Sequence, residues 1–262
     1  MRWLGIGYRT PLSEWIDSRP AGLSCLELTA EHFFDDPDLN RVRTLRNRYA
    51  LFVHGLGLSL GTPGPLDRTT LQAFKRVSDA AAPEWISEHV AFTAADDIDL
   101  GHLNPLAPTR ASLQILIDHA RELSDVCQRP LLLENITSHL RVTGELSETE
   151  FLNALCAKAD CRLLLDVTNL YINAQNHGFD PLTWLRQLEP SNLRQLHIVG
   201  YSKRGAAFED YHGAPIQDEL IDLLREVLRY APVEAVILER DDHFDADDIA
   251  RELKKLEAAC AA

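Results

Sequence analysis

A short apolar run that closes on a carboxylate, Leu131-Leu132-Leu133-Glu134, decides the fold of this chain. The same pattern returns as Leu163-Leu164-Leu165-Asp166 and as Val236-Ile237-Leu238-Glu239. In a parallel sheet that is buried on both faces, a strand is a nearly continuous run of Val, Ile and Leu. A charged residue at the end of such a strand therefore needs a binding partner or a function.

Eight apolar runs of this kind occur along the 262 residues. They are Trp3–Tyr8, Leu23–Thr29, Leu51–Gly55, Trp85–Phe92, Pro130–Asn135, Cys161–Val167, Leu193–Gly200 and Val233–Arg240. Segments with helical periodicity lie between them: Asp67–Ala82, Thr109–Cys127, Ser147–Ala159, Asp180–Leu188, Pro215–Ala231 and Asp245–Ala261, with less regular ones at Pro11–Arg19 and Asp36–Tyr49. Ser147 with Glu150 predicts a capping box, and Asp67, Thr109 and Asp180 are expected N-caps.

Alternating strands and helices specify a parallel sheet with helices outside it, and eight such repeats close a barrel. We therefore expect an α/β fold, a single (β/α)8 TIM barrel that forms one catalytic domain over residues 1–262. An open doubly wound sheet is the alternative. The first strand, however, is not followed by the GxGxxG or Walker loop that a nucleotide-binding version of that sheet would carry.

Composition narrows the class of protein. A formal net charge of −14 argues against binding to nucleic acid, because phosphate contacts need clustered Lys and Arg. The sequence contains no apolar stretch long enough for a membrane span and no apparent signal peptide, so we expect a cytoplasmic protein without membrane contact. The five cysteines are scattered without a CxxC pair, which indicates buried, reduced thiols.

The C-terminal strand ends of a barrel converge on one face, so residues that are distant in sequence can meet there. Six runs close on or near a possible metal ligand, and the segment after the seventh run adds two more. These eight residues are His54, His89, Glu134, Asp166, His197, Asp210, His212 and Glu239. Glu27 or Glu31 stands near the end of the second run.

Four imidazoles and four carboxylates exceed what one octahedral ion accepts, so the pattern predicts more than one metal ion at the barrel mouth. Ligands of these two kinds without thiolate suit iron, manganese or zinc. The alternative for any single residue is a hydrogen-bonded core histidine, a salt bridge or a helix cap. The expected position of all eight residues at the same end of the barrel favours metal binding over these alternatives.

Polar residues are dense in Asp166–Gly178, just after the sixth strand, which suggests a functional loop. There Asn169 could ligate or orient a metal ion, and His177 could act as acid, base or supporting residue. The alternative is a helix start capped by Asn side chains. The longest irregular segments, Asp96–Pro108 and Tyr201–Ala214, are expected over the mouth. We expect the remaining histidines and Asp241 and Asp242 to be ordinary polar residues.

The motifs in this order resemble the multinuclear non-haem iron-dependent oxidative enzymes, the family of MbnB and TglH. The resemblance spans nearly the whole chain. It is carried by Gly5-Ile6-Gly7-Tyr8-Arg9, His54-Gly55, Leu58-Ser59-Leu60-Gly61, Ser87-Glu88-His89, Leu103-Asn104, Glu134-Asn135, Asp166, Asn169, Tyr171, Asn176-His177-Gly178, His197, Asp210, His212-Gly213, Pro215 and Glu239.

This resemblance implies an enzyme that holds two or three iron ions and uses molecular oxygen to modify a residue, commonly cysteine, of a ribosomally made precursor peptide. It also implies a small partner protein that binds the leader peptide. Carried over by motif, the eight residues above would be iron ligands, with Asn169 a further ligand and His177 close by. Two rivals remain open: a divalent-metal TIM-barrel isomerase or phosphoesterase, and a non-catalytic metal- or peptide-binding protein.

Overall fold

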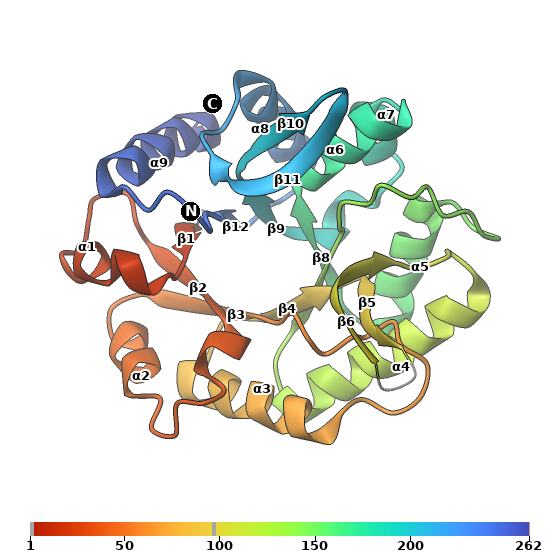
Figure 1. Ribbon diagram of the computed structural model, residues 1–262, viewed down its shortest axis with the longest axis horizontal. Helices are drawn as coiled ribbons and strands as arrows, with labels where there is room; N and C mark the ends of the chain where they lie inside the picture. Colours follow the sequence, from red (N-terminus) through yellow and green to blue (C-terminus); the bar gives the residue numbers. More distant parts are fainter. Residues whose placement is uncertain (1–2, 96–97, 262) are drawn as a thin grey trace.

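The computed structural model describes residues 3–95 and 98–261, and in it the eight apolar runs form a closed parallel barrel (Figure 1). Its strands are β1 Trp3–Gly7, β2 Cys25–Thr29, β3 Ala50–His54, β4 Ile86–His89, β7 Leu131–Glu134, β8 Arg162–Asp166, β9 Leu193–Ile198 and β12 Ala235–Leu238. They follow one another round the barrel in chain order, and β12 closes it against β1. The predicted (β/α)8 barrel is therefore confirmed.

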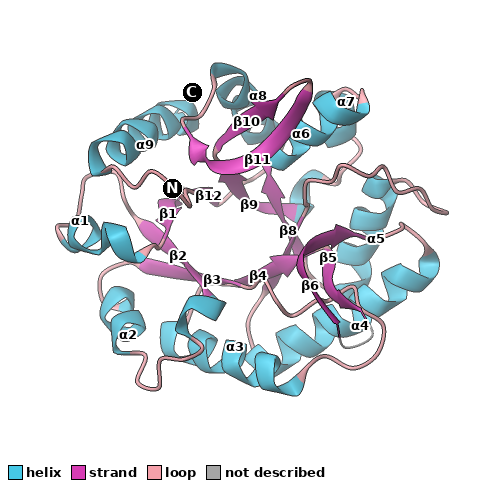
Figure 2. Ribbon diagram, viewed as in Figure 1, coloured by secondary structure: helices cyan, strands magenta, loops and turns pink. Residues whose placement is uncertain are grey.

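Helices surround the barrel (Figure 2). They are α1 Ser13–Asp17, α2 Asn40–Arg46, α3 Arg68–Ala81, α4 Arg110–Cys127, α5 Glu148–Ala159, α6 Val167–His177, α7 Pro181–Leu185, α8 Asp218–Tyr230 and α9 Ala246–Ala261, with 3-10 turns at Thr10–Leu12, Ala30–Phe33 and Pro190–Asn192. The expected caps are present at Asp67, Thr109, Ser147 and Asp180, each accepting a backbone N–H of the first turn. No helix among the described residues is long and apolar enough to cross a membrane.

Two segments that we expected to be irregular form β-hairpins instead. β5 Ala91–Ala95 pairs with β6 Ile98–Pro105, and β10 Gly200–Arg204 pairs with β11 Ala207–Ala214. Both hairpins follow barrel strands at the mouth, as expected for their position (Figure 1). Their charged and polar residues hid the strand pattern in the sequence. The first two residues of the acidic stretch Asp96–Asp99 lie outside the described residues, and Asp99 belongs to β6.

The segment after β8 is a helix and not the loop that we expected, and the cap at its start is Asp166 and not one of the Asn side chains of the alternative. Helix α6 begins directly at Val167, and the Asp166 side chain caps it by accepting the N–H of Asn169 at 2.6 Å. The four cysteines Cys25, Cys127, Cys156 and Cys161 are buried, and all five are free thiols.

The barrel interior has two layers because alternate residues of a strand face the same side. The lower layer is apolar and contains Cys25, Phe52, Trp85, Leu132, Leu164, Ala235 and Ile237. Phe52 and Trp85 stack there with ring centroids 4.3 Å apart. Two residues further along β3, β7, β8 and β12 stand His54, Glu134, Asp166 and Glu239. The upper layer is therefore made of potential ligands.

Candidate metal centre

The upper layer of the barrel and the segments directly above it gather ligand atoms in three sets, and within each set the atoms lie no more than 4.8 Å apart. The sets are His54, His89 and Glu134; Glu134, Asp166, His197 and Glu239; and His212, Glu239 and Asp241. Glu134 belongs to the first two sets and Glu239 to the last two. The three sets are thus linked in a row by shared carboxylates.

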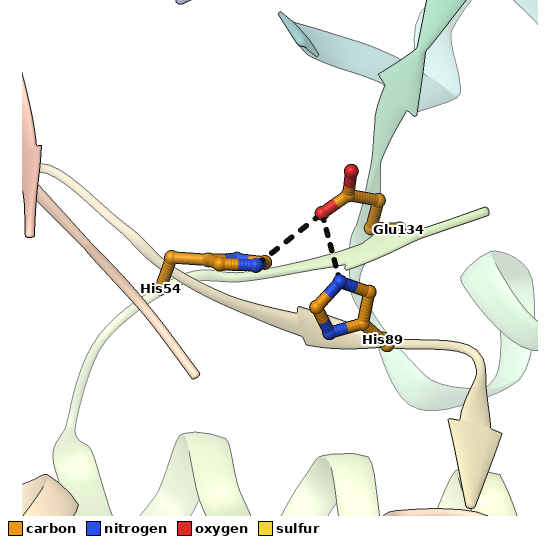
Figure 3. Close-up of side chains that lie close together, drawn as sticks. All are labelled: His54, His89 and Glu134. Carbon is orange, nitrogen blue, oxygen red and sulfur yellow. Dashed lines mark ion pairs between the residues drawn. The ribbon is translucent and has the colours of Figure 1, made fainter. Parts of the chain in front are cut away.

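The first set joins β3, β4 and β7 (Figure 3). The Nε2 atoms of His54 and His89 each lie 3.4 Å from the same oxygen, Oε2 of Glu134. Two ligands that are both about 2.1 Å from one metal ion lie roughly 3–3.4 Å apart, so this spacing suits a shared ion. The Nδ1 atom of His54 is hydrogen-bonded to Ser87 Oγ at 2.9 Å, which turns its Nε2 toward the centre.

The second set lies deepest and holds the most charge. His197 Nδ1 is 3.1 Å from both Glu134 Oε1 and Glu239 Oε2, and its Nε2 is 2.6 Å from Glu27 Oε1. Burial alone would lower the pKa of His197, but these three carboxylates raise it well above its usual value. Burial, followed by the Glu134 and Asp210 carboxylates, raises the pKa of Asp166 to about 8.

The third set lies on the β10–β11 hairpin and the segment after β12. His212 Nδ1 is 2.9 Å from Asp241 Oδ2, and its Nε2 is 2.8 Å from Asp210 Oδ1. The backbone of His212 is in the left-handed region with φ at 44°, a strained conformation of the kind that clusters at functional sites. Against the effect of burial, the Glu239, Asp210 and Asp241 carboxylates raise the pKa of His212 to about 12.

Sequence reasoning missed some residues of this centre. Asp241, expected to be an ordinary loop residue, is in the third set, where Arg9 Nε donates to it at 2.6 Å. Glu27 was noted at its strand end but left out of the predicted ligands, although it contacts His197. Gln195, two residues before His197, donates to Glu27. The period of two residues along β2 and β9 could have identified Glu27 and Gln195 as interior residues.

The two residues predicted after β8 have different locations. Asn169 lines the mouth cavity, its Nδ2 donates to the Asn135 carbonyl at 3.1 Å, and its Oδ1 is buried without a hydrogen-bond partner in the described part of the chain. His177 is outside the three sets, and its Nε2 donates to the Ser138 carbonyl at 2.7 Å. Asp210 lines the mouth and reaches the centre through His212.

Five of the ten buried side-chain atoms without a hydrogen-bond partner in the described residues belong to these residues, which tests whether they fit metal ions. Among the described residues, His54 Nε2, His89 Nδ1, Glu134 Oε2, Asp166 Oδ2 and Asn169 Oδ1 are buried without a hydrogen-bond partner. Such atoms are rare in proteins, and each needs an explanation. His54 Nε2, Glu134 Oε2 and Asp166 Oδ2 belong to the ligand sets and fit polyvalent cations, which would also offset the repulsion among the carboxylates. His89 Nδ1 faces Glu88 at 3.5 Å, so the ligand atom of His89 is its Nε2.

Comparison with known proteins assigns the chain to a family of enzymes. A profile of the family described as RiPP precursor modification enzyme MbnB/TglH/ChrH matches residues 3–261. The chain therefore belongs to this family, whose members modify ribosomally synthesised precursor peptides (RiPPs).

Similar proteins from other bacteria align with most of the chain. A UPF0276 protein of Chromobacterium violaceum is 35% identical over 240 residues, which cover 90% of this chain and 87% of the relative. A UPF0276 protein of Caulobacter vibrioides is 31% identical over 263 residues, which cover 98% of this chain and 94% of the relative.

Solved structures share the fold at low sequence identity. Endonuclease IV from Thermus thermophilus superposes with a TM-score of 0.64 at 16% identity, covering 100% of this chain and 99% of its own. The IOLI protein with a binding zinc atom gives a TM-score of 0.63 at 12% identity, covering 100% and 98%. These similarities support the barrel architecture.

Proposed function

We propose that this chain is an oxygen-dependent multinuclear iron enzyme that oxidises a cysteine residue of a ribosomally synthesised precursor peptide. The observation that carries the proposal is the row of three linked ligand sets at the mouth of a barrel that belongs to a precursor-modification family. In this reaction the peptide residue loses electrons and molecular oxygen accepts them.

The first two sets, which use His54, His89, Glu134, Asp166, His197 and Glu239, would hold two iron ions. The third set, which uses His212, Glu239 and Asp241, would hold a third iron ion. Asp210 lies beside the third set and Asn169 beside the second. Bound iron would supply positions for oxygen and for a cysteine thiol, whose pKa a metal ion lowers. Mixed imidazole and carboxylate ligands with open positions suit non-haem iron.

The chain's own residues prepare the ligands for this task. Ser87 fixes the ring of His54, and Glu27 and Gln195 fix the ring of His197. Without metal, the Glu134 and Glu88 carboxylates outweigh the effect of burial and raise the pKa of His89 to about 9. His89 and Asp166 therefore release protons when a cation binds, because only their deprotonated forms are ligands.

We further propose that residues 1–262 act as one catalytic domain and that a separate small protein recruits the substrate by binding its leader. The partner follows from the family resemblance. The mouth cavity of about 580 Å³, which Glu134, Asn169, His212 and Glu239 line, is large enough for the reacting part of a peptide.

The test is anaerobic purification with iron quantitation and Mössbauer spectroscopy, followed by addition of oxygen and a cysteine-containing precursor peptide with its partner. We expect more than one iron per chain and oxygen uptake that depends on the peptide. The variant His89→Ala should lose iron and turnover, whereas His139→Ala, which changes an exposed histidine outside the three sets, should keep both.

Other outcomes would favour the rivals. Zinc or manganese with hydrolysis of a phosphate ester or isomerisation of a sugar, and without oxygen uptake, would replace the proposal by the isomerase or phosphoesterase. A metal-loaded protein that takes up no oxygen with peptide would indicate a binding protein.

A further inference from the structure

A second cavity of about 580 Å³ adjoins the mouth. It lies between the segment 136–146, which connects β7 with α5, and the helices α5, α6 and α7. Ile136 lines both this cavity and the mouth cavity, so the two spaces share a wall. Figure 1 shows the connecting segment leaving the mouth and running outward on the side of α5 and α7.

One face of α6 holds the shared wall in place. Asn169, Asn173 and His177 are spaced four residues apart and therefore lie on the same side of the helix. Their side chains donate in turn to the carbonyls of Asn135, Ile136 and Ser138 at 3.1, 2.8 and 2.7 Å. Asn173 Oδ1 also accepts the N–H of Ser138 at 3.0 Å. His177 is thus a positioning residue of this wall.

The second cavity has apolar and aromatic walls next to polar ones, and Arg141, Glu148 and Asp180 are among its charged lining residues. Its walls include Leu146, Phe151, Phe179 and Trp184, and Glu148 Oε2 fixes the Trp184 indole by accepting its N–H at 2.9 Å. At its rim, Leu140 is 69% exposed and Val142 37% exposed. Together with the apolar walls below them, these two exposed side chains extend the apolar surface of the cavity out to its rim.

We propose that this second cavity binds a large apolar or aromatic side chain of the precursor peptide, close in sequence to the residue that the metal centre oxidises. The inference rests on the proposed function for the identity of the occupant. The wall at Ile136 supports it, because a peptide seated in the mouth can pass over this residue and enter the second cavity without leaving the protein surface. Each extended residue advances about 3.3–3.6 Å, so a near neighbour of the reacting residue can reach the cavity.

The test uses heptapeptides with capped ends that consist of glycine with a cysteine at the centre. In each peptide one of the six glycines is replaced by either Phe or Asp. Binding to the iron-loaded protein is measured without oxygen by titration calorimetry. We expect at least one position where Phe binds about tenfold or more tightly than Asp, because the cavity buries an aromatic side chain. The double variant Leu140→Asp with Val142→Asp should reduce that preference to about twofold or less, by the same argument.

A matched control is Ile98→Asp, which changes another strongly exposed apolar residue, 63% exposed, that does not line the cavity. This variant should keep the preference of the unaltered protein. Absence of a preference for Phe at every position, or a preference that survives in the double variant, would overturn the inference.

The two proposals can fail separately. If all the peptides are oxidised at equal rates in the presence of oxygen, and none binds preferentially, the proposed peptide site in the second cavity is wrong and the oxidative function is supported. A preference for Phe that the double variant abolishes, in an iron-loaded protein that also fails to oxidise the full precursor peptide in the presence of its partner, would support the apolar site and contradict the oxidative function.

Discussion

Replacing Glu134 by Gln is the most demanding test of the linked centre, because this one carboxylate belongs to two of the three sets. The change keeps the side-chain shape and removes the negative charge. It leaves the first set with two unaltered ligands, His54 and His89, and the second with three. The third set keeps all of its members.

The magnitude follows from the position of the residue. Loss of a supporting residue beside a metal ligand typically weakens metal binding about 10–100-fold, so loss of a shared ligand should weaken two ions by at least about 100-fold each. That corresponds to about 2.7 kcal/mol per ion. The pKa of His89 should also fall from about 9, because Glu134 is the first of the carboxylates that raise it.

The assay is anaerobic titration of ferrous ion against a competing chelator, with iron counted per chain. Asp241→Asn is the control, because it alters only the third set and should weaken one ion. Equal iron content in Glu134→Gln and the unaltered protein, or equal losses in the two variants, would refute the linked arrangement.

Three further predictions concern protons, the wall and the core. In the metal-free protein, the raised pKa values of His89 (about 9) and Asp166 (about 8) mean that the folded state binds these protons more tightly than the unfolded state. The free energy of unfolding should therefore fall as the pH rises from 6.5 to 9, as measured by urea denaturation, and metal affinity should rise over the same range. Asn173→Ala removes two hydrogen bonds to the shared wall and should cost about 1–3 kcal/mol locally, seen as faster amide exchange at Ser138 with iron content unchanged. Phe52→Ala should destabilise the barrel by about 3–5 kcal/mol without loss of iron, because the residue lies in the apolar layer below the ligands; loss of iron from the folded variant would contradict the two-layer description.

The barrel strands could be predicted because most are short, mainly apolar runs, such as Leu131–Glu134, and the rule that strand ends converge then placed His54, Glu134, Asp166 and Glu239 together. Helix boundaries at Ser147 and Asp67 followed from capping chemistry, which is local. These features depend on short stretches of sequence, so the sequence alone is enough to identify them.

The remaining features depend on contacts between distant segments. The β10–β11 hairpin was not expected, because charged residues such as Lys203 and Asp210 break its apolar pattern. The sequence does not distinguish Asp241 from the acidic residues next to it. Its contacts with Arg9 and His212, which are distant in sequence, do so. His177 was expected near the metal ions, but a helix begins at Val167 and carries it away from them to Ser138.

The third ligand set is supported by different structural elements from the other two. Those two are built on barrel strands, whereas His212 stands on a hairpin that is attached to α6 through Asn176, whose side chain exchanges two hydrogen bonds with the Phe208 backbone. A shift of this hairpin would separate His212 from Glu239 and Asp241 while the two sets on the barrel strands kept their arrangement. In the proposed centre, the number of bound ions would then depend on how this β-ribbon is held by α6 and by the segment after β12, where the Asp241 N–H donates to the His212 carbonyl at 2.8 Å.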